Sequence, residues 1–139
     1  MIRAVLDAGV LIAGLISSSG APAGLLDAVG DGRFDLVVSP MLFEETRRAL
    51  SYPKLQRYVT ADEADAFIAW IARVGIVLAD PAEIPNVTRD RDDDYLFALA
   101  VAADADVVVS GDADITSAPA PPIRVLTPRA FLDTLLSGD

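Results

Sequence analysis

Short apolar runs alternate along the chain with longer segments that carry helix signals. The runs that we expect to form strands are residues 2–6, 34–38, 76–78, 106–110 and 123–126. The segments that we expect to form helices are residues 21–29, a helix from 40, 60–73, 93–103 and a helix from 128. Strands that alternate with helices need crossover connections, which predicts an α/β fold with a central parallel sheet flanked by helices.

Local signals mark where several of these helices begin. Ser39 and Thr127 each precede a proline, a pattern typical of a cap followed by the first helical residue. Thr60 and Glu63 have the spacing of a capping box. The helix at 93–103 is apolar on nearly all sides, and the second and fourth strands are valine-rich, so we expect these elements to be buried.

Length and hydrophobicity favour one folded domain over residues 1–139. Hydrophobic residues make up 53% of the chain, which argues against disorder. The apolar run at 95–103 is much shorter than the roughly 20 residues of a membrane span. The start of the sequence leads directly into the first strand and leaves no room for a signal peptide, so we expect a cytoplasmic protein without membrane attachment.

The chain has no cysteine and no histidine, and this restricts its chemistry. Thiolate nucleophiles, serine–histidine–aspartate triads and histidine metal motifs are excluded. Acid–base chemistry must therefore come from carboxylates, tyrosine, the single lysine Lys54 or a metal-bound water. The formal charge of −10, taken alone, argues against nucleic-acid binding, which usually shows a basic surface.

Acidic residues gather where the predicted strands end. They are Asp7 after the first strand, Glu44 and Glu45 after the second, residues 92–94 at the start of the buried helix, and Asp112 and Asp114 after the fourth strand. Ligands of open parallel sheets bind at this edge. Two carboxylates 4 Å apart repel by roughly 4 kcal/mol at an effective dielectric of 20, so such a cluster needs a cation. All-oxygen ligands suit Mg²⁺ or Mn²⁺, which can support phosphodiester hydrolysis.

Each acid also has an ordinary structural interpretation. An aspartate after a strand is often a turn or cap residue, and the triplet at 92–94 could simply favour a helix dipole. Asp114 could cap a short turn. Helical phase separates the two glutamates: at about 100° per residue, Glu44 falls about 180° from the centre of the apolar face and Glu45 about 80° from it. Glu45 is therefore the better candidate ligand.

Several segments, in this order and spacing, are similar to one family. They are residues 5–11, 37–45, 53–55, 89–100 and 105–114. The chain resembles PIN-domain proteins, especially VapC-like ribonuclease toxins of bacterial type II toxin–antitoxin systems. The resemblance implies a three-layer PIN-like fold and Mg²⁺- or Mn²⁺-dependent cleavage of single-stranded RNA by an endoribonuclease. It also implies a protein antitoxin and a homodimer.

Carried over residue by residue, the resemblance assigns a catalytic and metal-binding set of Asp7, Glu45, Asp94 and Asp112, with Asp114 as an accessory metal ligand. The family usually has asparagine where this chain has Gly9, and threonine where it has Ser110. Residues 47–57 carry four basic side chains and no acid, so Arg48 and Lys54, together with Ser110, are the candidates for substrate contact.

Other protein classes fit the sequence less well. Phosphatases of the haloacid dehalogenase type need a second aspartate two positions after the first, where this chain has Gly9. Receiver domains need a lysine after a late strand, and Lys54 is too early. The alternative that stays open is a catalytically weak or inactive PIN-fold module that binds RNA or a protein.

Overall fold

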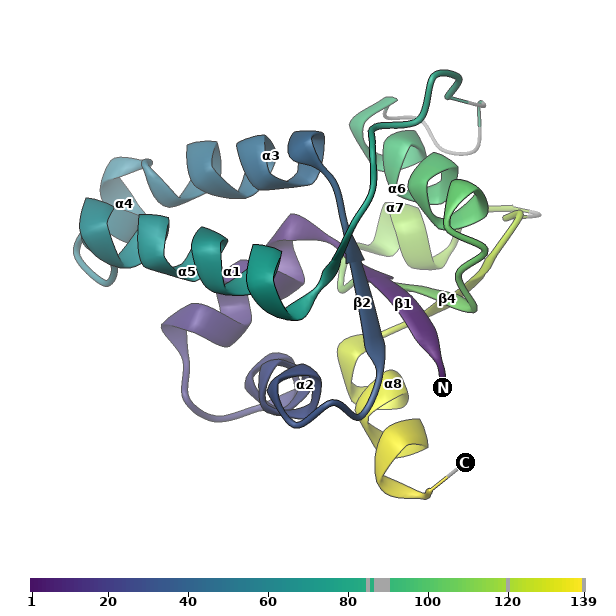
Figure 1. Ribbon diagram of the computed structural model, residues 1–139, viewed down its shortest axis with the longest axis horizontal. Coiled ribbons are helices and arrows are strands. Elements are labelled where there is room, and N and C mark those ends of the chain that lie inside the picture. Colours follow the sequence, from purple (N-terminus) through teal and green to yellow (C-terminus); the bar gives the residue numbers. More distant parts are fainter. Residues whose placement is uncertain (85, 87–90, 120, 139) are drawn as a thin grey trace.

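A computed structural model describes residues 1–84, 86, 91–119 and 121–138, with the backbone alone for Arg91 and Asp92. The strands are β1 (Arg3–Leu6), β2 (Asp35–Val38), β3 (Ile76–Val77), β4 (Val107–Val109) and β5 (Arg124–Leu126). The helices are α1 (Ala8–Ile16), α2 (Ala21–Gly30), α3 (Pro40–Leu50), α4 (Pro53–Gln56), α5 (Ala61–Val74), α6 (Arg91–Ala102), α7 (Ala113–Thr116) and α8 (Pro128–Leu136). Figure 1 shows their arrangement.

The five strands form one parallel sheet in the order β3-β2-β1-β4-β5. All the predicted strands are therefore confirmed, and so is the parallel sheet. The chain moves outward from β1 through β2 to β3, then returns and continues on the other side with β4 and β5. The direction of winding thus changes between β1 and β4, which is where open α/β sheets form a crevice at their carboxyl edge.

Helices cover the sheet on both faces. Figure 1 shows α6 and α7 on one side, with α1, α2, α3 and α5 on the other. The valines of β4 are at most 3% exposed, and α6 is buried from Tyr95 to Ala100, as predicted. In the described part of the chain, no single helix has the length and hydrophobicity of a membrane span. Helices α1 and α2 have them only when taken as a pair, and the two helices are bent by 93° relative to each other.

Helix starts agree with the sequence signals except at α3. Thr60 and Glu63 form the predicted capping box, and Thr127 accepts a hydrogen bond from the Ala130 backbone. Ser39 occupies the cap position of α3, but its side chain makes no capping bond, and its buried Oγ has no hydrogen-bond partner among the described residues. Asp80, from the segment after β3, accepts from the first turn of α3 instead.

Three helices have no counterpart among the predicted elements: α1, α4 and α7. Helix α1 is apolar on most sides and contains two glycines, so its periodicity is weak. Asp7 nevertheless caps it by accepting a hydrogen bond from the Val10 backbone at 2.7 Å. Helices α4 and α7 are single turns, too short to give a periodic pattern.

The two glycines of α1 predict opposite responses to a methyl group. A Cβ on Gly14 would lie 2.9 Å from the Pro22 carbonyl oxygen, whereas one on Gly9 would have its nearest contact at 3.4 Å. We expect Gly9→Ala to stabilise the protein by about 0.5–1 kcal/mol through helix propensity. Gly14→Ala should destabilise it by about 1–3 kcal/mol through overpacking. Urea denaturation measures both, and the same sign for the two variants would contradict the packing of α1 against α2.

Candidate functional site

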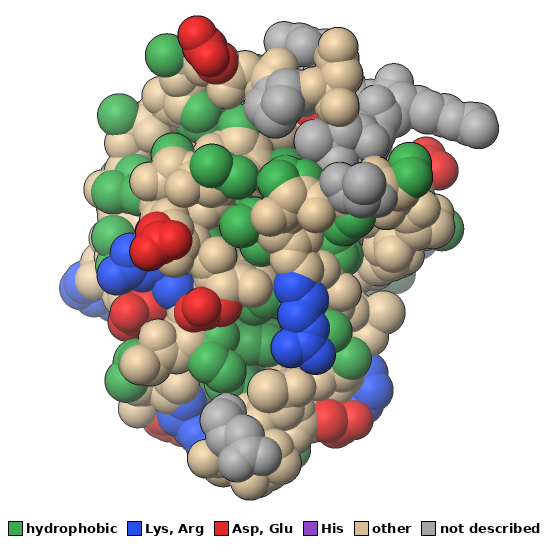
Figure 2. Space-filling model, turned by 90° about the vertical axis from the view of Figure 1, so that its right-hand side faces the viewer, with side chains coloured by type: hydrophobic (Ala, Val, Ile, Leu, Met, Phe, Trp, Pro, Cys, Tyr) green, Lys and Arg blue, Asp and Glu red, His purple; other side chains and the backbone are tan. Residues whose placement is uncertain are grey.

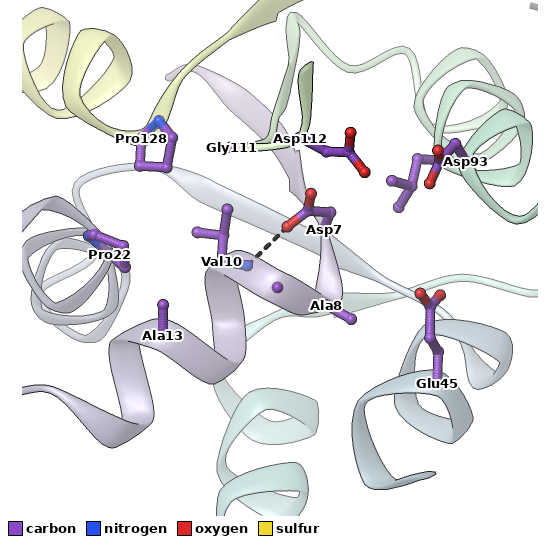
Figure 3. A pocket seen from close by; sticks show the side chains of 12 residues that line it. Asp7, Ala8, Val10, Ala13, Pro22, Glu45, Asp93, Gly111, Asp112 and Pro128 are labelled. Carbon is purple, nitrogen blue, oxygen red and sulfur yellow. Dashed lines mark hydrogen bonds between the residues drawn. The ribbon is translucent and has the colours of Figure 1, made fainter. Parts of the chain in front are cut away.

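A cavity of about 400 Å³ opens at the carboxyl edge of the sheet, where β1 and β4 lie side by side. Its acidic lining residues are Asp7, Glu45, Asp93 and Asp112, and they come from four different segments. Figure 3 shows their carboxylates directed towards a common space. The other side of the cavity is apolar and is lined by Val10, Ala13, Pro22 and Pro128. The cavity therefore combines an anionic wall with an apolar wall.

Asp7 is held in one orientation by both of its carboxylate oxygens. Its Oδ1 accepts the hydrogen bond from the Val10 backbone, and its Oδ2 accepts one from the Ser110 hydroxyl. The Ser110 oxygen in turn accepts from the backbone N–H of Asp112 at 3.0 Å. Ser110 is 0% exposed, so its hydroxyl links the two aspartates and presents no surface to a substrate.

The environment of Asp7 disfavours its charge. Burial raises the pKa of its carboxyl above the ordinary value, and the negative charge of Asp112 adds to this rise. The hydrogen bonds from Ser110 and Val10 act in the opposite direction without cancelling it. An added cation would relieve this destabilisation, because it favours the charged form of a nearby acid.

The acids after β4 have distinct positions. Asp112 is exposed, lines the cavity and caps α7 by accepting a hydrogen bond from the Asp114 backbone at 2.8 Å. Asp114 is exposed in the first turn of α7 and does not line the cavity. The cap of this turn is thus Asp112, and not Asp114 as the ordinary interpretation of the sequence supposed.

Helix α3 separates its two glutamates as helical phase predicts. Glu45 is half-buried and lines the cavity, whereas the adjacent Glu44 is exposed. The buried face of α3 is formed by Leu42, Thr46 and Leu50. The geometry therefore confirms the predicted phase, while the role of Glu45 as a ligand stays a prediction.

The acids of α6 are arranged differently from the expectation. Asp93 is half-buried and lines the cavity. Asp94, which the resemblance selects, is only 1% exposed and is not among the lining residues. The sequence shows a run of adjacent acids at this position, but the run does not determine which of them faces the cavity. Arg89 and Asp90, and the side chain of Asp92, lie outside the described residues.

The basic candidates stand apart from the cavity. Arg48 is exposed one turn beyond Glu45, and Lys54 is exposed on α4. Figure 1 places α4 at the end of α3 that is remote from α6 and α7. On the α6 side, Figure 2 shows acidic and basic side chains interspersed among hydrophobic ones over the described residues. Neither Arg48 nor Lys54 lines the cavity, and their role in substrate contact stays a prediction.

The acidic wall provides the oxygen donors that Mg²⁺ and Mn²⁺ prefer. Within the described residues, no group of three or more acids is close enough to hold an ion without movement. Asp7 and Asp112 are close enough for the charge of one to raise the pKa of the other. The donor set fits a hard divalent ion in its chemistry, since one or two carboxylates with several waters can hold such an ion.

Removing the charge of Asp7 should stabilise the protein at neutral pH. The pKa of Asp7 is higher in the folded protein than in the unfolded chain, so the folded protein binds the Asp7 proton more tightly. Protonation of Asp7 therefore stabilises the folded protein, and this stabilisation is lost as pH rises through the folded pKa. In metal-free buffer, Asp7→Asn should therefore increase the free energy of unfolding at pH 7. The gain should shrink as pH falls towards 3.8, the ordinary pKa. Urea denaturation across pH measures it, and a gain that grows on acidification would contradict the raised pKa.

Two solved structures share this fold. PAE2754 from Pyrobaculum aerophilum is 16% identical, with a TM-score of 0.66, over 98% of this chain and 90% of that chain. VapBC2 from Rickettsia felis, bound to a DNA fragment from their promoter, is 10% identical, with a TM-score of 0.61, over 91% of this chain and 98% of that chain. At such identities the likeness is one of fold alone. No curated protein matches the sequence.

The sequence itself carries the family assignment. The family model described as PIN domain matches residues 3–114. That match begins at β1 and ends within α7, so it contains all four acids of the cavity wall. The strand order and the parallel sheet also agree with the fold that the resemblance implied. This chain therefore belongs to the PIN domain family.

Proposed function

We propose that this protein is a Mg²⁺- or Mn²⁺-dependent endoribonuclease that hydrolyses phosphodiester bonds of single-stranded RNA. The observation that carries the proposal is the meeting of Asp7, Glu45, Asp93 and Asp112, from four segments, on one wall of one cavity. The absence of histidine and cysteine from the sequence leaves carboxylates as the groups that can hold an ion.

Each residue of the wall has a role in this proposal. A bound divalent ion supplies activation of water and stabilisation of charge on the phosphoryl oxygens. Asp7 and Asp112 would hold the ion, and Ser110 fixes the Asp7 carboxylate and the Asp112 backbone relative to each other. Glu45 and an acid of α6 complete the donor set. Asp93 is the α6 acid that lines the cavity, and Asp94 is buried next to it in the sequence.

The apolar wall of the cavity suggests how part of the substrate would bind. Val10, Ala13, Pro22 and Pro128 lie beside the acids, where a nucleoside next to the scissile phosphate could rest. Most small-molecule sites share this combination of apolar lining and a few polar groups. An extended strand that leaves the cavity along α3 would reach Arg48 and then Lys54, whose charges would attract phosphates. RNA, as opposed to DNA, is the substrate that the family resemblance implies.

The biological setting belongs to the proposal as well. The solved structure of VapBC2 bound to promoter DNA has a similar fold. Together with the resemblance of the sequence to VapC-like toxins, this supports a toxin that acts in the cytoplasm as a homodimer and is paired with a protein antitoxin. The partner is testable by co-purification from a host that expresses the neighbouring genes.

Two observations favour a second function. No group of three or more acids among the described residues is spaced to hold an ion without movement, and Gly9 replaces the usual asparagine. Both features suit a catalytically weak or inactive PIN-fold module that binds RNA or a protein. Mn²⁺ binding without cleavage of any RNA in a mixed pool would favour this second function.

The proposal predicts that cleavage depends on the metal and on the paired aspartates. Asp7→Asn and Asp112→Asn each remove one hard ligand and should lower the RNA cleavage rate in Mn²⁺ by about a hundred-fold or more, since even outer-shell changes cost about ten- to a hundred-fold. Asp133→Asn, at an exposed site on α8, is the matched control and should retain the rate. Thermal melting verifies folding. Full cleavage in EDTA would refute the metal requirement.

The two adjacent glutamates give a sharper comparison, because each substitution removes one charge from the same turn of α3. Glu45→Gln should weaken Mn²⁺ affinity by about ten-fold or more. Glu44→Gln, at an exposed position outside the cavity lining, should change it by less than about two-fold. Calorimetric titration with Mn²⁺ measures both. An equal loss in the two variants would mean that only the general charge near the helix matters.

A further inference from the structure

The start of α3 is held by a residue that is distant in sequence. Asp80 follows β3, and its Oδ1 accepts a hydrogen bond from the Met41 backbone N–H at 3.0 Å. The side chain of Ser39, which occupies the cap position, makes no capping bond. The first turn of α3 therefore depends on Asp80 for the capping that a helix start normally receives from its own cap residue.

A tyrosine of α6 converges on the same atom. The Tyr95 side chain is 1% exposed, and its hydroxyl donates to Asp80 Oδ1 at 3.3 Å. Burial, followed by the charge of Asp80 and its hydrogen bond, raises the pKa of Tyr95, with a smaller contribution from Glu45. The phenol consequently remains a neutral donor at physiological pH.

These contacts join the two helices that bring acids to the cavity. Glu45 is four residues after Met41, and residues at that spacing lie one above the other on a helix face. Tyr95 is adjacent to Asp94 and two residues after Asp93. The Asp80–Tyr95 pair thus connects the first turn of α3, which precedes Glu45, to the start of α6, which carries Asp93 and Asp94.

We propose that Asp80 and Tyr95 are positioning residues, which hold Glu45 at a fixed place relative to the acids of α6 and thereby set the affinity of the cavity for a divalent ion. Neither residue lines the cavity, so both act through α3. The inference rests on the proposed metal-dependent function. If Asp80 and Tyr95 act by positioning Glu45, substitutions at either of them should affect metal binding only while the Glu45 carboxylate is present.

A double-mutant cycle on the full chain tests this dependence with Mn²⁺ alone as the probe. Calorimetric titration compares the wild type, Tyr95→Phe, Glu45→Gln and the double variant. Tyr95→Phe should weaken Mn²⁺ binding by about five-fold, within the range of coupling between neighbouring residues. It should cause no further loss once Glu45 is glutamine. Tyr58→Phe, at a tyrosine that is 61% exposed, is the matched control and should leave the affinity unchanged.

Substitutions at Asp80 separate positioning from charge. Asp80→Asn keeps an oxygen that can accept from Met41 and Tyr95 but loses the charge, so it should retain affinity within about two-fold, whereas Asp80→Ala should lose as much as Tyr95→Phe or more. This pair also decides the matter if Tyr95→Phe fails to fold. Equal losses in both Glu45 backgrounds, or Asn as deleterious as Ala, would overturn the inference while leaving the proposed function intact. A wild-type protein that binds no Mn²⁺ would overturn both.

Discussion

Carboxylates that share a small space repel one another, by roughly 4 kcal/mol for a pair 4 Å apart at an effective dielectric of 20, and this chain brings four of them to one cavity wall. The cost is visible at Asp7, where burial and the charge of Asp112 raise the pKa. The fold tolerates the arrangement because backbone N–H groups and the Ser110 hydroxyl donate to Asp7 and Asp112. A bound cation would reduce the same repulsion.

The sheet topology explains why these acids meet. Since winding reverses between β1 and β4, the chain after each strand turns away on a different face and leaves a crevice between them. Asp7 directly follows β1, and Asp112 lies three residues after the end of β4; each caps the helix that begins there. Glu45 and Asp93 arrive from helices on opposite sides of the sheet. The link from Asp80 to Tyr95 joins those two helices across the gap.

Much of this arrangement was predictable from the sequence, because strands buried on both faces and acids at their ends leave clear patterns. Helical phase was enough to distinguish Glu45 from Glu44. It could not separate Asp93 from Asp94, because α6 is apolar on almost all sides and offers no exposed face as a reference. The capping of α3 by Asp80 was equally hidden, since a partner 39 residues away leaves no local signal. The sequence predicts Ser110 as a substrate contact, but the residue is buried, and a hydroxyl next to acids does not reveal its burial.

If the acidic wall holds a divalent ion, as proposed, Asp7 and Asp112 would be among its ligands. Anomalous diffraction at the manganese edge, on crystals grown with Mn²⁺, tests it most directly. We expect a peak within coordination distance of both carboxylates, about 2.0–2.3 Å from their oxygens, with the Glu45 side chain turned towards it. A protein that cleaves RNA in the same Mn²⁺ buffer, but whose crystals show no ion in this cavity or an ion elsewhere, would contradict the account.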